Sequence, residues 1–303
     1  MKVAEAEKHS SLQLQQIYSE GEAAAIASML LEHVTGNDRS GRVRKRHTIL
    51  SPEQMEKLEH GLQRLMEHEP VQYVTGKAWF MQMELFVDNS VLIPRPETEE
   101  LVTWIIDDVK ASGKEVFERQ PMQADKTTQL KILDVGTGSG CIALALKKAM
   151  PTAEVWGCDI SDEALNVARR NGSTLDIRVD FQGMNFLDES QHALLPFVDV
   201  IVSNPPYIPV SSKESMMANV LNFEPHTALF VPHNDVLVFY RYLAMFGKQR
   251  LYANGSIYME IHEDLSHEVI QLFETQGYQS VELKKDMQGK DRMVKAVWAN
   301  GIK

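Results

Sequence analysis

A β-prone stretch that leads directly into a glycine-rich turn is the feature that most restricts how this chain can fold. Residues 131–135 read as a strand, and residues 132–140 together read ILDVGTGSG. Glycine has no Cβ atom, so the backbone of such a turn can approach a ligand closely at the carboxyl end of a strand. Residues 141–149 then read as a helix. This order of strand, glycine turn and helix predicts a ligand-binding α/β domain.

Strands and helices alternate along much of the chain after this turn. The β-prone stretches 154–158, 198–202 and 256–260 are separated by amphipathic segments such as 162–171. Alternation of this kind is typical of a mostly parallel sheet that is covered by helices. Residues 111–129 are polar and show little periodicity, so we expect a loop before the first core strand.

The beginning of the chain has a different, helical character. Ser51 and Gln54 can form a capping box ahead of an apolar helix face, and residues 22–34 form a second helical stretch that Gly36 closes. Neither stretch carries a cluster of catalytic residues. We therefore expect a small helical bundle over residues 1–77 that serves recognition or support.

A β-prone segment lies between these two regions. Residues 78–93 contain apolar and aromatic residues that are interrupted at 88–90 by Asp-Asn-Ser, which favours a turn. We expect a β-hairpin that joins the two domains. The predicted boundaries are 1–77 for the helical domain, 78–93 for the hairpin and 94–303 for the α/β domain.

Composition argues against several classes of partner and location. The chain has 303 residues, of which 44% are hydrophobic, and its net charge of -11 offers no general attraction to nucleic-acid phosphates. Residues 1–16 are too polar for a signal peptide, and the sequence has no apolar stretch long enough to span a bilayer. Cys141 and Cys158 lack the spacing of metal ligands. We expect a cytoplasmic protein without membrane or direct nucleic-acid partners.

The glycine turn and the strand ends that follow it favour binding of a nucleoside. The Gly-x-Gly-x-Gly spacing of residues 136–140 differs from that of NAD or FAD sites and fits a methyltransferase better. Asp159 ends the next strand and could accept hydrogen bonds from two ribose hydroxyls. Phe186 could flank an adenine ring while Asn185 meets its edge. The alternatives are that Asp159 caps the helix near Ser161 and that Phe186 belongs to the core.

The residues after strand 198–202 carry the candidate reactive motif. Pro205 and Pro206 lack backbone donors, so this segment presents carbonyl acceptors in fixed directions. The side-chain oxygen of Asn204 and the carbonyl of Pro205 could hold the two hydrogens of a flat NH₂ group and aim its nitrogen at a sulfonium methyl group. Tyr207 would pack on this group and exclude water. The motif predicts methyl transfer to a planar amide or amine nitrogen.

Two other functions compete with this interpretation. DNA adenine amino methyltransferases use the same motif on an extruded base, although the acidity of this chain counts against them. A noncatalytic protein that binds S-adenosylmethionine, or a scaffold, would not need an intact motif at 204–207. No metal site is expected, because His226, His233 and His262 lack paired spacing.

At this point the sequence resembles the release factor glutamine methyltransferases, the HemK/PrmC family, over most of its length. The segment 91–99, which reads VLIPRPETE, is highly specific to that family. The other similar segments are the cofactor turn and residues 70–76, 204–207, 223–225, 258–261 and 286–292.

The resemblance implies both a fold and a reaction. The fold would be α/β, a Rossmann-like class I S-adenosylmethionine-dependent methyltransferase domain with an N-terminal helical substrate-recognition domain and a β-hairpin linker. The reaction would methylate N5 of the glutamine in the Gly-Gly-Gln motif of class 1 peptide chain release factors, with S-adenosylhomocysteine as the second product and no metal. The implied site residues are Gly136, Thr137, Gly138, Ser139, Gly140, Asp159, Asn185, Phe186 and Asn204 for the cofactor, Asn204, Pro205, Pro206 and Tyr207 for the substrate, and Arg95, Glu97 and Thr98 as support.

The chain departs from the family pattern at two places. Asn185 stands where the family usually has Asp, which changes the expected contact with the adenine amino group. Residues 230–236 read FVPHNDV where the family tends to have a glycine-rich segment, so the loop geometry there is expected to differ. Neither departure affects Asn204.

Overall fold

The chain folds into two compact units. The structure is a computed structural model that describes residues 1–112, 129–232 and 235–301. One unit comprises Met1–Lys77 with Met216–Phe223, and the other comprises Ala78–Ser215 with Glu224–Lys303. Most of the loop expected at 111–129 lies outside the described residues, as do His233 and Asn234 of the loop expected to differ at 230–236.

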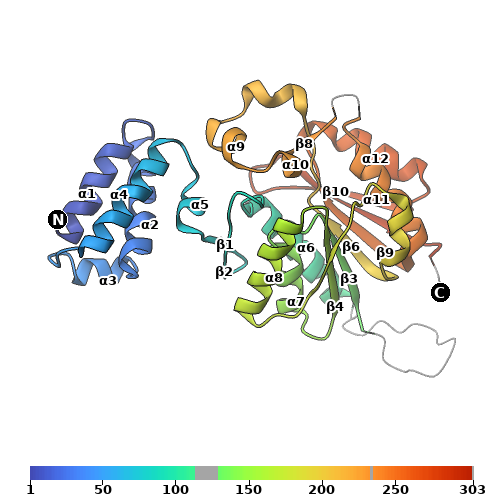
Figure 1. Cartoon of the computed structure of the whole chain (residues 1–303). Helices are drawn as coiled ribbons and strands as arrows, with labels where there is room; N and C mark the ends of the chain where they lie inside the picture. Colours follow the sequence, from blue (N-terminus) through green and yellow to red (C-terminus); the bar gives the residue numbers. More distant parts are fainter. Residues whose placement is uncertain (113–128, 233–234, 302–303) are drawn as a thin grey trace. The chain divides into compact units, whose positions relative to one another are not determined.

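The first unit consists of helices around a leucine-rich core. Ser51 and Gln54 exchange two bonds, each from a backbone N–H to the other's side chain, at 3.2 and 3.0 Å, so the predicted capping box is confirmed. Gly36 ends its helix in a left-handed conformation, as expected. Leu30 and Leu65 are fully buried. The helices are α1 (Val3–Leu14), α2 (Glu20–Thr35), α3 (Arg39–Arg44), α4 (Pro52–Met66), α5 (Val71–Thr75) and α9 (Ala218–Phe223) (Figure 1).

The second unit begins with the predicted hairpin, but its turn is not where the sequence suggested. Strands β1 (Ala78–Phe80) and β2 (Met83–Leu85) pair antiparallel through a turn at Met81 and Gln82, which both have positive φ. A turn does form at 88–90, where Asp88 accepts a hydrogen bond from the backbone of Ser90. It leads into an extended loop and not into a second strand, so the prediction that this turn connects the two hairpin strands was wrong.

Seven strands in the described part of this unit form one sheet, in the order β10-β11-β9-β6-β3-β4-β5. The five strands from β9 to β5 in this order are parallel, whereas β11 is antiparallel to β9 and β10. The prediction of a mostly parallel sheet is therefore confirmed. The strands are β3 (Lys131–Val135), β4 (Glu154–Asp159), β5 (Asp180–Gly183), β6 (Val198–Ser203), β9 (Leu251–Glu260), β10 (Ser280–Lys285) and β11 (Asp291–Trp298) (Figure 1).

Helices cover both faces of the sheet, and each face has its own apolar core. Ile105, Leu144 and Leu165 belong to the core on one face, and Tyr240 and Phe273 belong to the core on the other. No helix in the described parts of the chain combines the length and apolar character that a membrane crossing requires. The first face is covered by α6 (Pro96–Ala111), α7 (Cys141–Ala149) and α8 (Asp162–Leu175), and the second by α11 (Val238–Arg250) and α12 (Ser266–Thr275) (Figure 1).

Candidate active site

A cavity of about 340 Å³ lies at the carboxyl ends of β3, β4 and β6, within the second unit. Open α/β sheets bind their ligands at this edge, because neighbouring parallel strands present their ends together there. The glycine turn, Asp159, Asn185, Phe186 and Asn204 all line the cavity, so four distant parts of the sequence meet in it. The walls come from parts of segments 90–98, 135–142, 158–164, 184–187, 203–206 and 225–232 and from Phe239.

The three glycines of the turn differ in what surrounds them. Gly136, Gly138 and Gly140 all have positive φ, at 72°, 53° and 80°. A Cβ atom added at Gly136 or Gly138 would have no described atom within 4 Å, whereas one at Gly140 would meet Ala168 and Phe181 at 3.1 Å. The first two glycines therefore leave space beside the cavity, and the third allows close packing of the turn against α8 and β5.

Thr137 and Ser139, which the sequence places in the cofactor site, direct their side chains into the protein. Both are buried, and the Thr137 hydroxyl donates to Oδ2 of Asp134 at 2.7 Å. Burial raises the pKa of the Asp134 carboxyl to about 7. Thr137 and Ser139 would thus contact a ligand through their backbone. Asp134 is a buried hydrogen-bond acceptor that holds the turn, and the sequence alone did not indicate this role.

Asp159 fastens the glycine turn to the neighbouring strand. Its Oδ2 accepts from the backbone of Gly138 at 2.8 Å and its Oδ1 accepts from the backbone of Ser161 at 3.0 Å. Burial raises the pKa of Asp159, while these backbone hydrogen bonds lower it. The cap of α8 is the Ser161 hydroxyl, which accepts from Ala164 at 3.1 Å. Asp159 is therefore not the helix cap and stays a candidate ligand-binding carboxylate.

Phe186 and Asn185 follow β5 at the same edge of the sheet. Phe186 is 6% exposed and packs against Phe246 with ring centroids 5.3 Å apart, so it belongs to the core while one side lines the cavity. Asn185 is exposed, and its Oδ1 accepts from the backbone of Leu187 at 3.1 Å. This bond shapes the turn after β5 and occupies the oxygen of the amide.

The motif at 204–207 leaves β6 beside the end of β9, and a buried glutamate joins the two. Asn204 donates from Nδ2 to the hydroxyl of Thr98 at 3.1 Å. Thr98 donates to Oε2 of Glu260 at 2.7 Å, and Tyr207 donates to Oε1 of the same carboxylate at 3.1 Å. Glu260 is 2% exposed. The sequence reasoning did not assign this residue, although a charged side chain at the end of an apolar strand is a usable signal.

The expected support residues occupy different positions. Arg95 and Thr98 line the cavity, whereas Glu97 is not among the described residues that do. The guanidinium of Arg95 contacts Oε1 of Glu224 at 2.6 Å, and Oε2 of Glu224 accepts from the backbone of Ile93 at 3.3 Å. Glu224 is almost fully buried, so this ion pair fixes the loop before α6 to the chain that follows the reactive motif.

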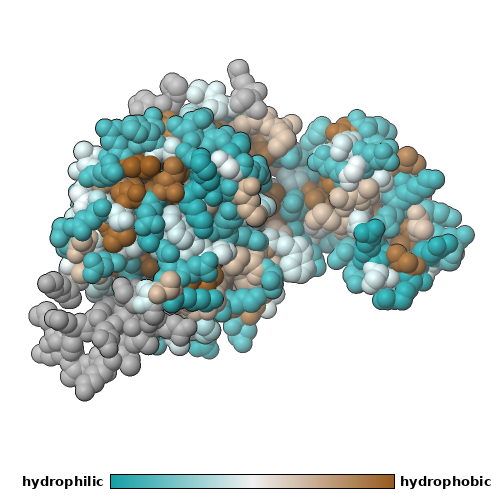
Figure 2. Space-filling model, turned by 180° about the vertical axis from the view of Figure 1, so that it is seen from behind, coloured by the Kyte–Doolittle hydropathy of each residue, from teal (hydrophilic) through white to brown (hydrophobic). Residues whose placement is uncertain are grey.

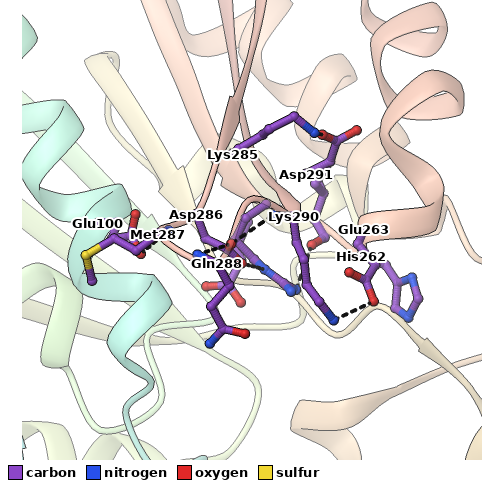
Figure 3. A network of polar contacts seen from close by, with 12 residues as sticks. Glu100, His262, Glu263, Lys285, Asp286, Met287, Gln288, Lys290 and Asp291 are labelled. Carbon is purple, nitrogen blue, oxygen red and sulfur yellow. Dashed lines mark hydrogen bonds and ion pairs between the residues drawn. The ribbon is translucent and has the colours of Figure 1, made fainter.

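The turn between β10 and β11 lies at the same edge of the sheet and is held by a polar network (Figure 3). Asp286 accepts from the backbone of Gln288 and Lys290, and Lys290 pairs with Glu263 at 3.0 Å. Asp286 also accepts from Arg292 at 3.2 Å. Burial raises the pKa of Glu260, and the charge of Arg292 opposes part of that rise. The family-like segment 286–292 thereby supports the site electrostatically.

Comparison with known proteins identifies the family. The profile of the PrmC N-terminal domain matches residues 5–76, and that of the methyltransferase small domain matches residues 119–227. A release factor glutamine methyltransferase from Flavobacterium psychrophilum is 40% identical over 82% of this chain and 84% of its own length. The chain belongs to the release factor glutamine methyltransferase family. It is accordingly a methyltransferase, and the family resemblance expected from the sequence is confirmed.

Two further relatives match still more of the chain. The relative from Bacteroides thetaiotaomicron is 38% identical over 93% of this chain and 95% of its own length. A bifunctional methyltransferase from Rickettsia typhi is 36% identical over 88% of this chain and 52% of its own length. Among solved structures, the hMettl16 catalytic domain is 15% identical and superposes with a TM-score of 0.51 over 82% of each chain, which confirms the Rossmann-like methyltransferase fold.

Proposed function

We propose that this protein transfers the methyl group of S-adenosylmethionine to the side-chain amide nitrogen, N5, of the glutamine in the Gly-Gly-Gln motif of class 1 peptide chain release factors. The observation that carries the proposal is the orientation of Asn204 at the cavity wall. Its NH₂ group is bonded to Thr98, so its Oδ1 is the atom left to accept a hydrogen bond from a substrate. The relatives named above support the choice of a release factor as substrate.

The residues of the cavity fit S-adenosylmethionine. Gly136 and Gly138 leave open space beside their backbone, and Asp159 offers carboxylate oxygens to hydroxyl groups, with Phe186 providing an apolar surface for an adenine ring. When bound, this cofactor supplies an electrophilic methyl group on a sulfonium. Asp159 ends the strand that follows the glycine turn, and an acidic residue that binds a ribose is expected at this position.

The protein's own contribution to the reaction would be positioning. An amide nitrogen is a weak nucleophile because its lone pair is delocalised into the carbonyl group. Asn204 Oδ1 and the Pro205 carbonyl would each accept one hydrogen of the substrate NH₂ group and so direct its nitrogen. Tyr207 would cover the flat amide, since its hydroxyl is held by Glu260 and its ring orientation is therefore restricted.

The test of this function is the transfer of labelled methyl from S-adenosylmethionine to a purified release factor. Label on the wild-type factor, and none on a factor whose Gly-Gly-Gln glutamine is changed to alanine, supports the proposal. Duplex DNA is the parallel substrate, and label found only there would replace the glutamine with an adenine amino group. Label on neither substrate would favour a noncatalytic binding protein.

The substitution Asn204→Ala separates substrate positioning from cofactor binding. The change removes the acceptor for the substrate amide, so we expect methyl transfer to fall by about 100-fold or more. Affinity for S-adenosylhomocysteine, measured by calorimetry, should change little. The matched control is Asn166→Ala on the exposed side of α8, which should leave both measurements unchanged. A parallel loss of cofactor affinity would assign Asn204 to the cofactor instead.

For residues 1–77 we propose recognition of the folded release factor, with residues 78–93 as the linker to the catalytic residues 94–303. Deletion of residues 1–77 should lower kcat/KM for an intact release factor by about tenfold or more, because contacts away from the glutamine would be lost. The value for a short Gly-Gly-Gln peptide should change much less. Equal losses on both substrates would leave this domain with a structural role alone.

A further inference from the structure

Glu260 occupies a position from which it reaches both ends of the reactive motif. It is the last residue of β9, and β9 pairs in parallel with β6, which ends immediately before Asn204. Tyr207 bonds to Glu260 directly, and Asn204 bonds to it through Thr98. Buried carboxylates are costly unless each oxygen is satisfied, and here each oxygen accepts a hydroxyl hydrogen. One buried group thus holds the first and the last residue of the motif.

The hydrogen bonds of this network have only one consistent direction while Glu260 is ionised. A carboxylate can accept but not donate, so the single hydroxyl hydrogen of Thr98 is committed to Glu260. The Thr98 oxygen can then act toward Asn204 only as an acceptor. Asn204 must turn its NH₂ group to Thr98 and its Oδ1 the other way. An amide with the opposite orientation would offer donors to a substrate NH₂ group that itself only donates.

We propose that Glu260 is a positioning residue that sets the direction of the Asn204–Thr98–Glu260 chain, so that Asn204 presents oxygen to the substrate amide. This inference rests on the proposed function, because it deepens the role of the same site. Glu260 touches neither the reacting nitrogen nor the methyl group and acts through Thr98. Its second oxygen fixes the Tyr207 hydroxyl, so the side chains at both ends of the motif depend on it.

The direction of these hydrogen bonds depends on whether Glu260 is ionised, and the groups around Glu260 set its pKa. Burial raises the pKa of Glu260, and the charge of Glu97 adds to that effect. The bonds from Thr98 and Tyr207 and the charge of Arg292 lower the pKa. Tyr240, from α11, donates to the backbone carbonyl of Glu260 at 3.3 Å. Protonation would let the carboxyl donate to Thr98 and reverse the chain, so transfer should fall at low pH through a pKa above that of an ordinary glutamate.

The first test is Glu260→Gln, assayed on a purified release factor with the full-length enzyme. The amide can accept from only one of its two partners and must donate to the other, so either the direction at Thr98 reverses or Tyr207 loses its acceptor, and kcat should fall by about tenfold or more. Affinity for S-adenosylhomocysteine should stay within about twofold, because Glu260 does not line the cavity among the described residues. The low-pH limb of the activity profile should disappear. Glu268→Gln, on the exposed side of α12, is the matched control.

Two variants at Thr98 test the middle of the chain. Thr98→Ser keeps the hydroxyl, so activity should stay within about threefold of the wild type. Thr98→Val has nearly the same shape without the hydroxyl and should lower kcat about as much as Glu260→Gln. Combining Thr98→Val with Glu260→Gln should cost little more than either change alone, since both break one chain. Additive losses would overturn the proposal.

The sharpest test reverses the chain deliberately. Asn204→Asp removes the hydrogens that Thr98 accepts, so this variant should have very low activity. Adding Glu260→Gln allows the new amide to donate to Thr98, whose hydrogen then turns to the carboxylate at position 204. The other carboxylate oxygen can then accept from the substrate. The double variant should transfer methyl at least about tenfold faster than Asn204→Asp alone.

The outcomes distinguish this inference from the proposed function. A wild-type enzyme that labels no release factor overturns the proposed function itself. A wild-type enzyme that labels the factor, together with unchanged kcat in Glu260→Gln, overturns only the positioning role. A double variant no faster than Asn204→Asp also overturns it. Circular dichroism of each variant confirms that the compared proteins are folded.

Discussion

Two glycines of the same turn should respond to the same substitution in different ways. We expect Gly140→Ala to destabilise the second unit strongly, whereas Gly138→Ala should mainly weaken cofactor binding. Both residues have positive φ, so alanine costs about 1–2 kcal/mol at either position. The difference arises from what surrounds the added methyl group.

At position 140 the methyl group would enter occupied space. It would lie 3.1 Å from the Cβ of Ala168 and 3.3 Å from its Cα, and neither atom can rotate away. Overpacking of this kind costs about 1–3 kcal/mol more, so the free energy of unfolding should fall by about 2–5 kcal/mol in total. At position 138 no described atom lies within 4 Å of the added Cβ, so only the cost of placing alanine at a positive φ applies.

Urea unfolding followed by tryptophan fluorescence measures these losses, because every tryptophan of the chain belongs to the second unit. Calorimetry with S-adenosylhomocysteine measures binding, for which Gly138→Ala should raise Kd by about tenfold or more as the methyl group takes ligand space. Equal losses of stability in the two variants would refute the packing role of Gly140. Normal cofactor affinity in Gly138→Ala would refute the role of Gly138 in leaving space for the ligand. The tryptophans are Trp79, Trp104, Trp156 and Trp298.

Two further predictions concern buried carboxylates. The pKa of Asp134 is about 7 in the folded protein and near 4 when unfolded, so the unfolded chain releases this proton first and folding stability should fall as pH rises from about 4 to about 7. Urea titrations over this range should show that the wild type loses a few kcal/mol more of unfolding free energy than Asp134→Asn does, and parallel profiles would contradict it. Arg95→Ala leaves Glu224 buried without its cation and should lower the free energy of unfolding by about 2 kcal/mol. Adding Glu224→Gln should restore part of that loss in thermal denaturation, and an unchanged or larger loss would contradict the pairing.

Local sequence patterns predicted the centre of the fold well. The strand at 131–135 and the helix at 141–149 have the predicted bounds, because a buried parallel strand, a glycine turn and an apolar helix each leave a local signal. β10 and β11 were not predicted. The residues of β10 are mostly exposed and half of them are charged, and its pairing with β11 depends on the rest of the sheet. The hairpin turn at Met81 and Gln82 uses residues that carry no turn preference.

The candidate site was predictable only in part, because local sequence patterns do not reveal contacts between residues that are far apart in the chain. Asn204, Asp159 and the glycine turn lie at strand ends in recognisable motifs. The bond from Thr98 to Glu260 joins residues 162 positions apart, and that from Ile93 to Glu224 joins residues 131 apart. Contacts at such separations depend on the completed sheet, so pattern reading could identify the reactive groups but not the buried acids that orient them.

The reversed direction of β11 has a practical consequence for experiments on this enzyme. β11 starts at the active-site edge, where Met293 pairs with Glu260, and runs to Trp298, which pairs with Gly255 near the start of β9. The end of β11 therefore lies toward the edge of the sheet opposite the cavity. A fluorophore, an affinity tag or a sensor surface attached after Trp298 would leave the catalytic edge of this unit open to a large protein substrate.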